Sequence, residues 1–215
     1  MIDLHTHSLL SDGLLLPSEL VRRALVNGVK TIAITDHADH SNIGRVIASL
    51  VEVSAVLNRY WDIKVLPGVE ITHVPIEVIG ELVAFSRKNG AKIVVVHGES
   101  PVEPVIKGTN RAAIEAKCDI LAHPGELLIE DAAMAASKGV YIELTARNGH
   151  NKTNKHVFDT SIKVGAKMVV NTDSHAPNDI MSIITHRNVF ESLTDSEKIK
   201  SEIIYNSTEL ISKIF

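Results

Sequence analysis

Six short apolar runs in this chain are each followed by histidine or carboxylate side chains, and this pattern constrains the fold more than any other feature. The runs are IDL, TIAI, IKVLPGV, AKIVVV, DILA and AKMVVN. The side chains that follow them are six histidines and three carboxylates: His5, His7, Asp12, His37, Glu70, His97, His123, Asp173 and His175. Such residues at the ends of many strands predict one polar site, at which those ends meet.

The chain alternates between strand-like and helix-like segments. Strands are expected at residues 2–7, 30–35, 63–70, 92–97, 119–123, 139–144 and 167–172. Helices are expected at residues 17–27, 43–58, 75–89, 109–117, 130–138 and 153–164, and then at 178–191, 195–205 and 207–214. The strands are short and β-branched without polar alternation, which is typical of a parallel sheet buried on both faces. Alternation with helices implies right-handed crossovers in an α/β fold.

A closed barrel explains the ligand positions better than an open sheet. An open doubly wound sheet concentrates its site at one switch point, whereas six of the seven expected strands contribute here. A ring of strands brings all their carboxyl ends together at one face. No Pro/Gly/Ser-rich linker divides the 215 residues, so one domain over residues 1–215 is expected.

Composition excludes some classes of function. The net charge of -4 argues against a dominant basic surface for nucleic acid. Cys118 is the only cysteine, so no intrachain disulfide forms, which fits a reducing compartment. The N-terminal MIDLHTHS lacks the features of a signal peptide, and no apolar run is long enough to span a membrane. We therefore expect a soluble cytoplasmic protein with no membrane partner.

The residue types at the predicted site indicate a metal centre. His5 and His7 are alternate residues and share one face of a strand, and Asp173 and His175 repeat this spacing. Imidazole and carboxylate ligands without cysteine suit Zn²⁺, Mn²⁺ or Fe²⁺. Each residue alone has an ordinary explanation as a turn, a cap or a buried histidine, but all nine together do not. Nine ligands exceed the needs of one ion, so two or three divalent ions are predicted, with Glu70 as the natural bridge.

Such a centre predicts chemistry on phosphate. Three divalent ions and three carboxylates would leave the mouth of the barrel with about three positive charges, which attract a phosphate dianion. Clusters of this kind ionise a bound water near neutral pH and stabilise in-line displacement at phosphorus.

The motifs DLHTHSLLSDG, ITDH, PGVE, VVHGE, ILAHPG and NTDSH, in this order, resemble those of the PHP (polymerase and histidinol phosphatase) family, in its compact histidinol-phosphatase-like branch. The resemblance implies a distorted, TIM-like (β/α)7 barrel with a trinuclear metal site. The implied ligand sets are His5, His7, Glu70 and Asp173 for the first ion, Glu70, His97 and His123 for the second, and Asp12, His37 and His175 for the third. Glu70 and Asp173 are the residues expected to be catalytic.

Substrate-binding residues are expected after strands that end at the same face. Arg147 and His150 follow the sixth strand, in ELTARNGHN, and could hold a phosphate or a leaving group. Arg111, in GTNRAA after the fourth strand, is a further candidate. His40 and His73 also follow ligand-bearing strands, but both are expected to be ordinary loop residues.

The sequence favours a metal-dependent phosphoesterase that hydrolyses small, histidinol-phosphate-like monoesters with a water or hydroxide activated at the trinuclear site. The alternative is a nucleotide or oligonucleotide phosphoesterase or nuclease of the same superfamily, so nucleic acid is a less favoured partner. An amidohydrolase-like enzyme is disfavoured because those proteins use a bridging lysine where this chain has His97. An RNA-binding barrel without activity is disfavoured because the ligand set is complete and the net charge is negative.

Overall fold

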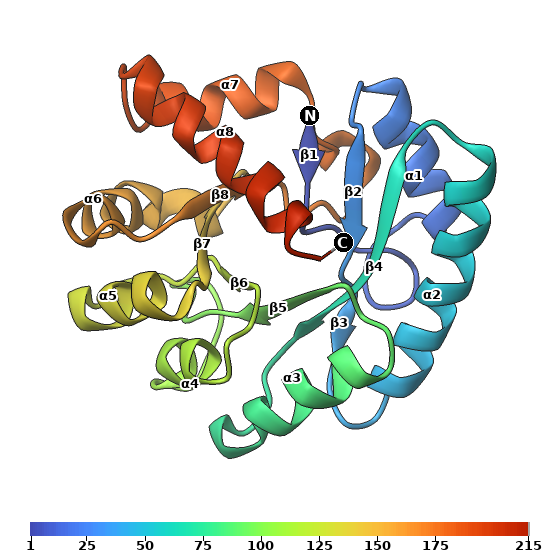
Figure 1. Ribbon diagram of the computed structural model, residues 1–215, viewed down its shortest axis with the longest axis horizontal. Helices are drawn as coiled ribbons and strands as arrows, with labels where there is room; N and C mark the ends of the chain where they lie inside the picture. Colours follow the sequence, from blue (N-terminus) through green and yellow to red (C-terminus); the bar gives the residue numbers. More distant parts are fainter. Residues whose placement is uncertain (215) are drawn as a thin grey trace.

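A ring of parallel strands with helices outside it forms the structure (Figure 1), which is a computed structural model that describes residues 1–214. Seven strands follow one another around the ring: β1 (Ile2–Asp3), β2 (Thr31–Ile34), β4 (Lys64–Ile71), β5 (Ile93–His97), β6 (Ile120–Ala122), β7 (Tyr141–Thr145) and β8 (Met168–Asn171). The short β3 (His37–Ala38) pairs with β4 beyond the end of β2. The predicted α/β barrel is confirmed.

The barrel closes between its first and last strands at the carboxyl end. Thr6 forms an isolated parallel bridge with Ser174, and the backbone N–H of His7 donates to the Ser174 carbonyl at 2.8 Å. The N–H of Asp173 donates to the carbonyl of His5 at 2.9 Å. The first strand was predicted to span residues 2–7, but its ladder with β2 ends at Asp3. Beyond it, the Thr6 carbonyl accepts a bond from the N–H of Thr35 on one side, and Thr6 bridges Ser174 on the other. Closure therefore sets the first histidine motif beside the last one.

The helices agree with the sequence pattern, with one correction. They are α1 (Pro17–Val26), α2 (Ile43–Tyr60), α3 (Ile79–Lys88), α4 (Thr109–Glu115), α5 (Ile129–Lys138), α6 (Asn154–Val164), α7 (Ile183–Glu191) and α8 (Glu197–Ser212). Short 3-10 turns occur at Ile76–Val78, His150–Thr153 and Pro177–Asp179. The two helices predicted at 195–205 and 207–214 are one helix, because the amide of Asn206 donates to the carbonyl of Met168 and does not break α8.

Two apolar layers make the core. The larger one lies between the strands and the surrounding helices. The smaller one fills the inside of the barrel with side chains such as Leu66, Ile93 and Tyr141, and Leu210 of α8 packs against it. Figure 1 shows the end of α8 lying across the centre of the ring. Since the interior is filled with side chains, the polar site lies only at the carboxyl ends of the strands.

Truncating Leu210 should therefore destabilise the whole barrel. Its side chain is 3% exposed, so we expect Leu210→Ala to lower the free energy of unfolding by about 2–5 kcal/mol. Chemical denaturation would measure the change. Ile204→Ala, on the same helix but 47% exposed, should stay within about 0.5 kcal/mol of the wild type. Equal effects of the two substitutions would contradict the role given to Leu210.

Among residues 1–214, none of the helices combines the length and the apolar character needed to cross a bilayer.

Candidate metal centre

The six predicted histidines form one continuous group at the carboxyl end of the barrel. The ring centroids are 5.0 Å apart for His5 and His7, and 4.2 Å apart for His7 and His37. His123 continues the group from the other side of His5, at 5.7 Å. The remaining two join through their neighbours: His175 lies 4.1 Å from His7, and His97 lies 4.4 Å from His123.

Glu70 lies at the centre of this group and is fully buried. It extends from β4, where Leu66 already points into the barrel interior and Glu70 follows on the same face. Its Oε2 atom lies 3.4 Å from His5 Nε2 and 3.5 Å from His7 Nε2. The same atom lies 2.8 Å from His37 Nδ1. His123 Nε2 lies 3.6 Å from the other oxygen, Oε1, so this carboxylate faces histidines from three segments of the chain, as expected of a bridge.

Asp12 and Asp173 also face histidines of this group. Asp173 Oδ1 lies 3.1 Å from His7 Nε2 and 3.7 Å from His5 Nε2. Asp12 Oδ1 lies 3.2 Å from His175 Nε2. The structure therefore brings all nine predicted ligand residues together.

The site contains buried polar atoms that have no hydrogen-bond partner within the described residues. These atoms are Nε2 of His5, both ring nitrogens of His7, both carboxylate oxygens of Glu70, Nδ1 of His123 and Oδ1 of Asp173. Buried polar atoms without partners are rare and costly. Bonds of about 2.0–2.1 Å to a tetrahedral ion place neighbouring ligand atoms about 3.3–3.4 Å apart, close to the separations described above. The residues present therefore fit divalent cations.

Burial and crowding perturb the protonation of the site. Burial raises the pKa of Asp173, and the nearby Glu70 contributes to bring it to about 7. Burial lowers the pKa of His37, but Glu70 and Asp12 outweigh this and raise it to about 9. Burial also opposes the charge of Glu70, yet His5 and His37 hold its pKa well below the usual value. In the protein without cations, protons on imidazoles thus balance the buried carboxylate.

The ligand atoms fall into several overlapping sets within bonding reach of one ion. They are His5, His7 and Glu70; His5, His123 and Asp173; His7, Asp12, His37 and His175; His73, His97 and Glu103; and His97, His123 and His150. The third of these contains the predicted set of Asp12, His37 and His175. The last contains His150, which the sequence suggested for substrate and which the structure places beside two predicted ligands.

The two arginines suggested for substrate binding occupy different places. Arg147 reaches the metal centre: its Nη1 donates to the carbonyl of Asp173 at 3.1 Å and lies 2.8 Å from His175 Nδ1. Arg111 instead pairs with Asp131, with Nε and Nη2 both 2.8 Å from Oδ1. That pair joins α4 to α5, so the guanidinium of Arg111 is held by the outer helical layer and is not brought to the centre.

Glu143 is a buried carboxylate that the sequence reasoning missed. It accepts a hydrogen bond from His5 Nδ1 at 2.8 Å, from the backbone N–H of His123 at 3.2 Å and from the amide of Asn171 at 2.9 Å. The bond fixes the His5 tautomer that leaves Nε2 free for a cation, as outer-shell carboxylates do at metal sites. Strand alternation could have found it, because Tyr141 and Glu143 point to the same side of β7.

We expect Glu143→Gln to lower metal affinity about 10- to 100-fold, because the amide cannot accept all three bonds and His5 loses its fixed tautomer. Competition with a chromogenic chelator would measure the affinity. Glu19→Gln, which alters an exposed pair with Arg23, is the matched control. Unchanged metal affinity in Glu143→Gln would mean that Glu143 does not support the metal centre.

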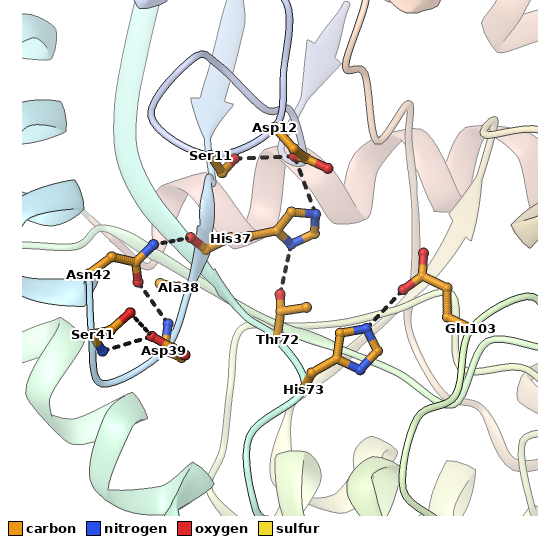
Figure 2. Close-up of a pocket in the computed structure, with 10 residues that line it drawn as sticks. All are labelled: Ser11, Asp12, His37, Ala38, Asp39, Ser41, Asn42, Thr72, His73 and Glu103. Atoms are coloured by element: carbon orange, nitrogen blue, oxygen red, sulfur yellow. Dashed lines mark hydrogen bonds and ion pairs between the residues drawn. The ribbon is translucent and has the colours of Figure 1, made fainter.

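Two cavities adjoin the centre. The first, of ≈ 440 Å³, is lined by Asp12, His37, His73 and Glu103 among other polar residues (Figure 2). The second, of ≈ 430 Å³, includes Arg147 in its lining. The first cavity therefore opens onto ligand residues of the centre, and the second lies beside Arg147.

The chain resembles known proteins over most of its length. The PHP domain family model matches residues 3–150. An uncharacterized protein of Methanocaldococcus jannaschii is 42% identical over 216 residues, which cover 99% of both chains. The DNA polymerase/3'-5' exonuclease PolX of Bacillus subtilis is 24% identical over 192 residues, which cover 80% of this chain but 34% of that protein.

Among solved structures, the histidinol phosphate phosphatase of Lactococcus lactis, complexed with zinc, L-histidinol and phosphate, has the same fold. It superimposes with a TM-score of 0.57 at 16% identity, and the match covers 99% of this chain and 93% of that one.

Proposed function

Because this chain belongs to the PHP domain family, whose enzymes are metal-dependent hydrolases of phosphoric esters, we propose that it hydrolyses small phosphate monoesters at a centre of two or three divalent cations. The observation that carries the proposal is the buried group of six histidines and three carboxylates, with its unpartnered ligand atoms. Zinc, manganese and iron(II) suit these donors. The zinc, histidinol and phosphate bound by the Lactococcus lactis phosphatase support a small phosphorylated substrate.

We assign the ligands in three sets. His5, His7, Glu70 and Asp173 hold the first ion, Glu70, His97 and His123 the second, and Asp12, His37 and His175 the third. The central position of Glu70 supports its role as a bridge between the first two ions. When bound, the ions supply positive charge that polarises a phosphate ester and lowers the pKa of a bound water.

Arg147 is the side chain best placed to hold the phosphate group. It extends from the loop after β7, is 31% exposed, and reaches Asp173 and His175 at the edge of the centre. A guanidinium presents two parallel N–H donors, which match two phosphate oxygens. Its contacts with Asp173 and His175 orient it toward the ions, so it can neutralise charge on the same phosphate that the ions bind.

We expect Arg147→Gln to lower kcat/KM about 10- to 100-fold, since a hydrogen bond to a charged group contributes about 1.5–3 kcal/mol. Steady-state kinetics on a phosphate monoester would measure the loss. Arg111→Gln is the control, because Arg111 is held by Asp131 away from the centre. A larger loss in Arg111→Gln than in Arg147→Gln would reverse these roles.

The proposed function is tested by loading the purified protein with Mn²⁺ or Zn²⁺ and assaying a panel of phosphate esters. The panel contains p-nitrophenyl phosphate and histidinol phosphate as monoesters, and bis(p-nitrophenyl) phosphate and a short oligonucleotide as diesters. We expect the monoesters to turn over faster. No turnover of any ester at full metal occupancy would refute the proposal.

A nuclease or nucleotide phosphoesterase is the second candidate. The similarity to PolX, which is named as an exonuclease, favours it. The cavity beside Asp12 and His37 and the cavity beside Arg147 also leave space for a chain that continues past the scissile phosphate. Faster cleavage of the oligonucleotide than of the monoesters would establish this alternative.

A further inference from the structure

Glu103 lies at the mouth of the metal centre and faces three imidazoles from three different segments. Its Oε2 atom lies 3.0 Å from His73 Nε2 and 3.1 Å from His97 Nε2. Its Oε1 atom lies 3.4 Å from His150 Nε2. Figure 2 shows Glu103 and His73 at the side of the cavity that also contains Asp12 and His37.

Two of these imidazoles are held in the orientation that metal ligands adopt. Nδ1 of His97 donates to the carbonyl of Gly98 at 3.0 Å, and Nδ1 of His150 is bonded to the hydroxyl of Ser100 at 2.8 Å. Each bond fixes the ring and directs Nε2 toward the mouth, as outer-shell partners do for ligating histidines. His150 is also 5% exposed, although it comes from the loop after β7.

The loop that bears Glu103 is anchored, so the carboxylate is held in place. The side chain of Glu99 accepts bonds from the backbone N–H groups of Gly108 and Asn110, and Asn110 donates to the carbonyl of Pro124. The loop also packs closely on the segment after His123: a Cβ on Gly125, whose φ is 63°, would lie 1.9 Å from the Glu99 carbonyl oxygen.

A cation explains this group better than hydrogen bonds alone. Nδ1 of His97 already donates to the Gly98 carbonyl, so in the neutral ring Nε2 carries a lone pair and cannot donate to Glu103. This Nε2 and the Glu103 oxygen 3.1 Å away are then both lone-pair atoms, which a cation between them satisfies. His97, His123 and His150 place one nitrogen each within 4.8 Å of one another. A single ion among these nitrogens satisfies their lone pairs, and Glu103 adds the negative charge.

We propose that His150 and Glu103 are ligands of the second ion and close its coordination shell on the mouth side. This inference rests on the metal centre of the proposed function, but not on any catalytic activity. The shell then contains three imidazoles with carboxylates, a donor set that Zn²⁺ accepts readily. His73 is the outer partner that orients Glu103, and its φ of 53° is a strained conformation that Asp173 shares.

The test counts the ions and measures their affinities with zinc alone. The metal-free protein is dialysed against graded free Zn²⁺, and bound zinc is determined by elemental analysis. We expect His150→Asn and Glu103→Gln each to bind one ion at least about 10-fold more weakly than the wild type, because even outer-shell losses cost 10- to 100-fold. The other ions should keep their affinities.

Matched controls come from the exposed pair of His156 and Glu126, whose atoms lie 3.9 Å apart outside the centre. His156→Asn and Glu126→Gln should bind zinc like the wild type. Cobalt(II) in place of zinc gives a second readout, since loss of a ligand changes its visible absorption and a merely loosened loop does not.

Unchanged zinc affinity and an unchanged cobalt spectrum in both His150→Asn and Glu103→Gln would overturn the inference. Equal weakening of every ion would also overturn it, because the two residues would then not belong to one shell. Absence of phosphatase activity in the wild type would refute the proposed function without changing the zinc count, so the two failures are distinguishable.

Discussion

Glu70→Ala and Asp173→Asn are expected to abolish phosphate-ester hydrolysis and to lower the metal content of the protein. Both carboxylates are almost fully buried, and both lie within ligand distance of the imidazoles of His5 and His7. Loss of a metal-borne contribution of about 4 kcal/mol to the transition state corresponds to a rate decrease of about 10³-fold. Glu70→Ala should have the greater effect, because alanine removes the whole carboxylate, whereas the asparagine in Asp173→Asn keeps one oxygen donor.

Activity assays and elemental analysis of the same preparations would check this expectation. Asp62→Asn is the control for Asp173→Asn, since Asp62 is 94% exposed and pairs with Lys30 away from the centre. Circular dichroism would show that the variants fold. Normal metal stoichiometry in both Glu70→Ala and Asp173→Asn would mean that the ligand assignment is wrong.

Removal of the metal with a chelator is expected to lower the Tm by roughly 8–16 °C. An ion present at 1,000 times its Kd stabilises the folded state by about 4 kcal/mol, and each 1 kcal/mol shifts the Tm of a chain of this size by about 2–4 °C. The physical source is the set of buried ligand atoms on His5, His7, Glu70 and Asp173 that lack other partners. Scanning calorimetry with and without excess EDTA would measure the shift.

The size of this shift should grow between pH 7 and pH 9. In the cation-free protein the pKa of His37 is raised to about 9, so its proton contributes stability that is complete below the unfolded pKa and is lost as the pH rises through 9. Cations bind the deprotonated ring and must displace this proton. Their affinity therefore rises about tenfold for each pH unit of increase up to pH 9. The chelated protein therefore loses stability with rising pH, whereas the loaded protein, whose His37 is deprotonated as in the unfolded chain, keeps its stability. A Tm difference that narrows from pH 7 to pH 9 would contradict this reasoning.

Local sequence patterns determined most of the architecture. The apolar strands recur at regular intervals between amphipathic helices, and helix signals such as Pro17 at the start of α1 are local. Errors occurred where distant contacts intervened. Asn206 reads as an interruption in the sequence, but its amide reaches Met168 on β8 and α8 continues through it.

The nine metal-ligand candidates could also be predicted from the sequence. In a parallel barrel every strand ends at the same face, so ligand-type residues just after apolar runs must meet. For the same reason the sequence could place Arg147, which follows the sixth strand, at this face of the barrel. For Arg111 the same reasoning failed, because its neighbour in space, Asp131, lies on the next helix and holds it in the outer layer.

What the sequence by itself determined is therefore the barrel and the identity of the residues at its mouth, because strand direction and alternation are properties of each local segment. Only the tertiary structure decided which other side chains surround and orient those residues. Glu143 orients His5 across 138 positions of sequence, and Glu103 meets His150 across a separate loop. Such pairings depend on how the barrel closes and how its loops pack, which no local pattern encodes.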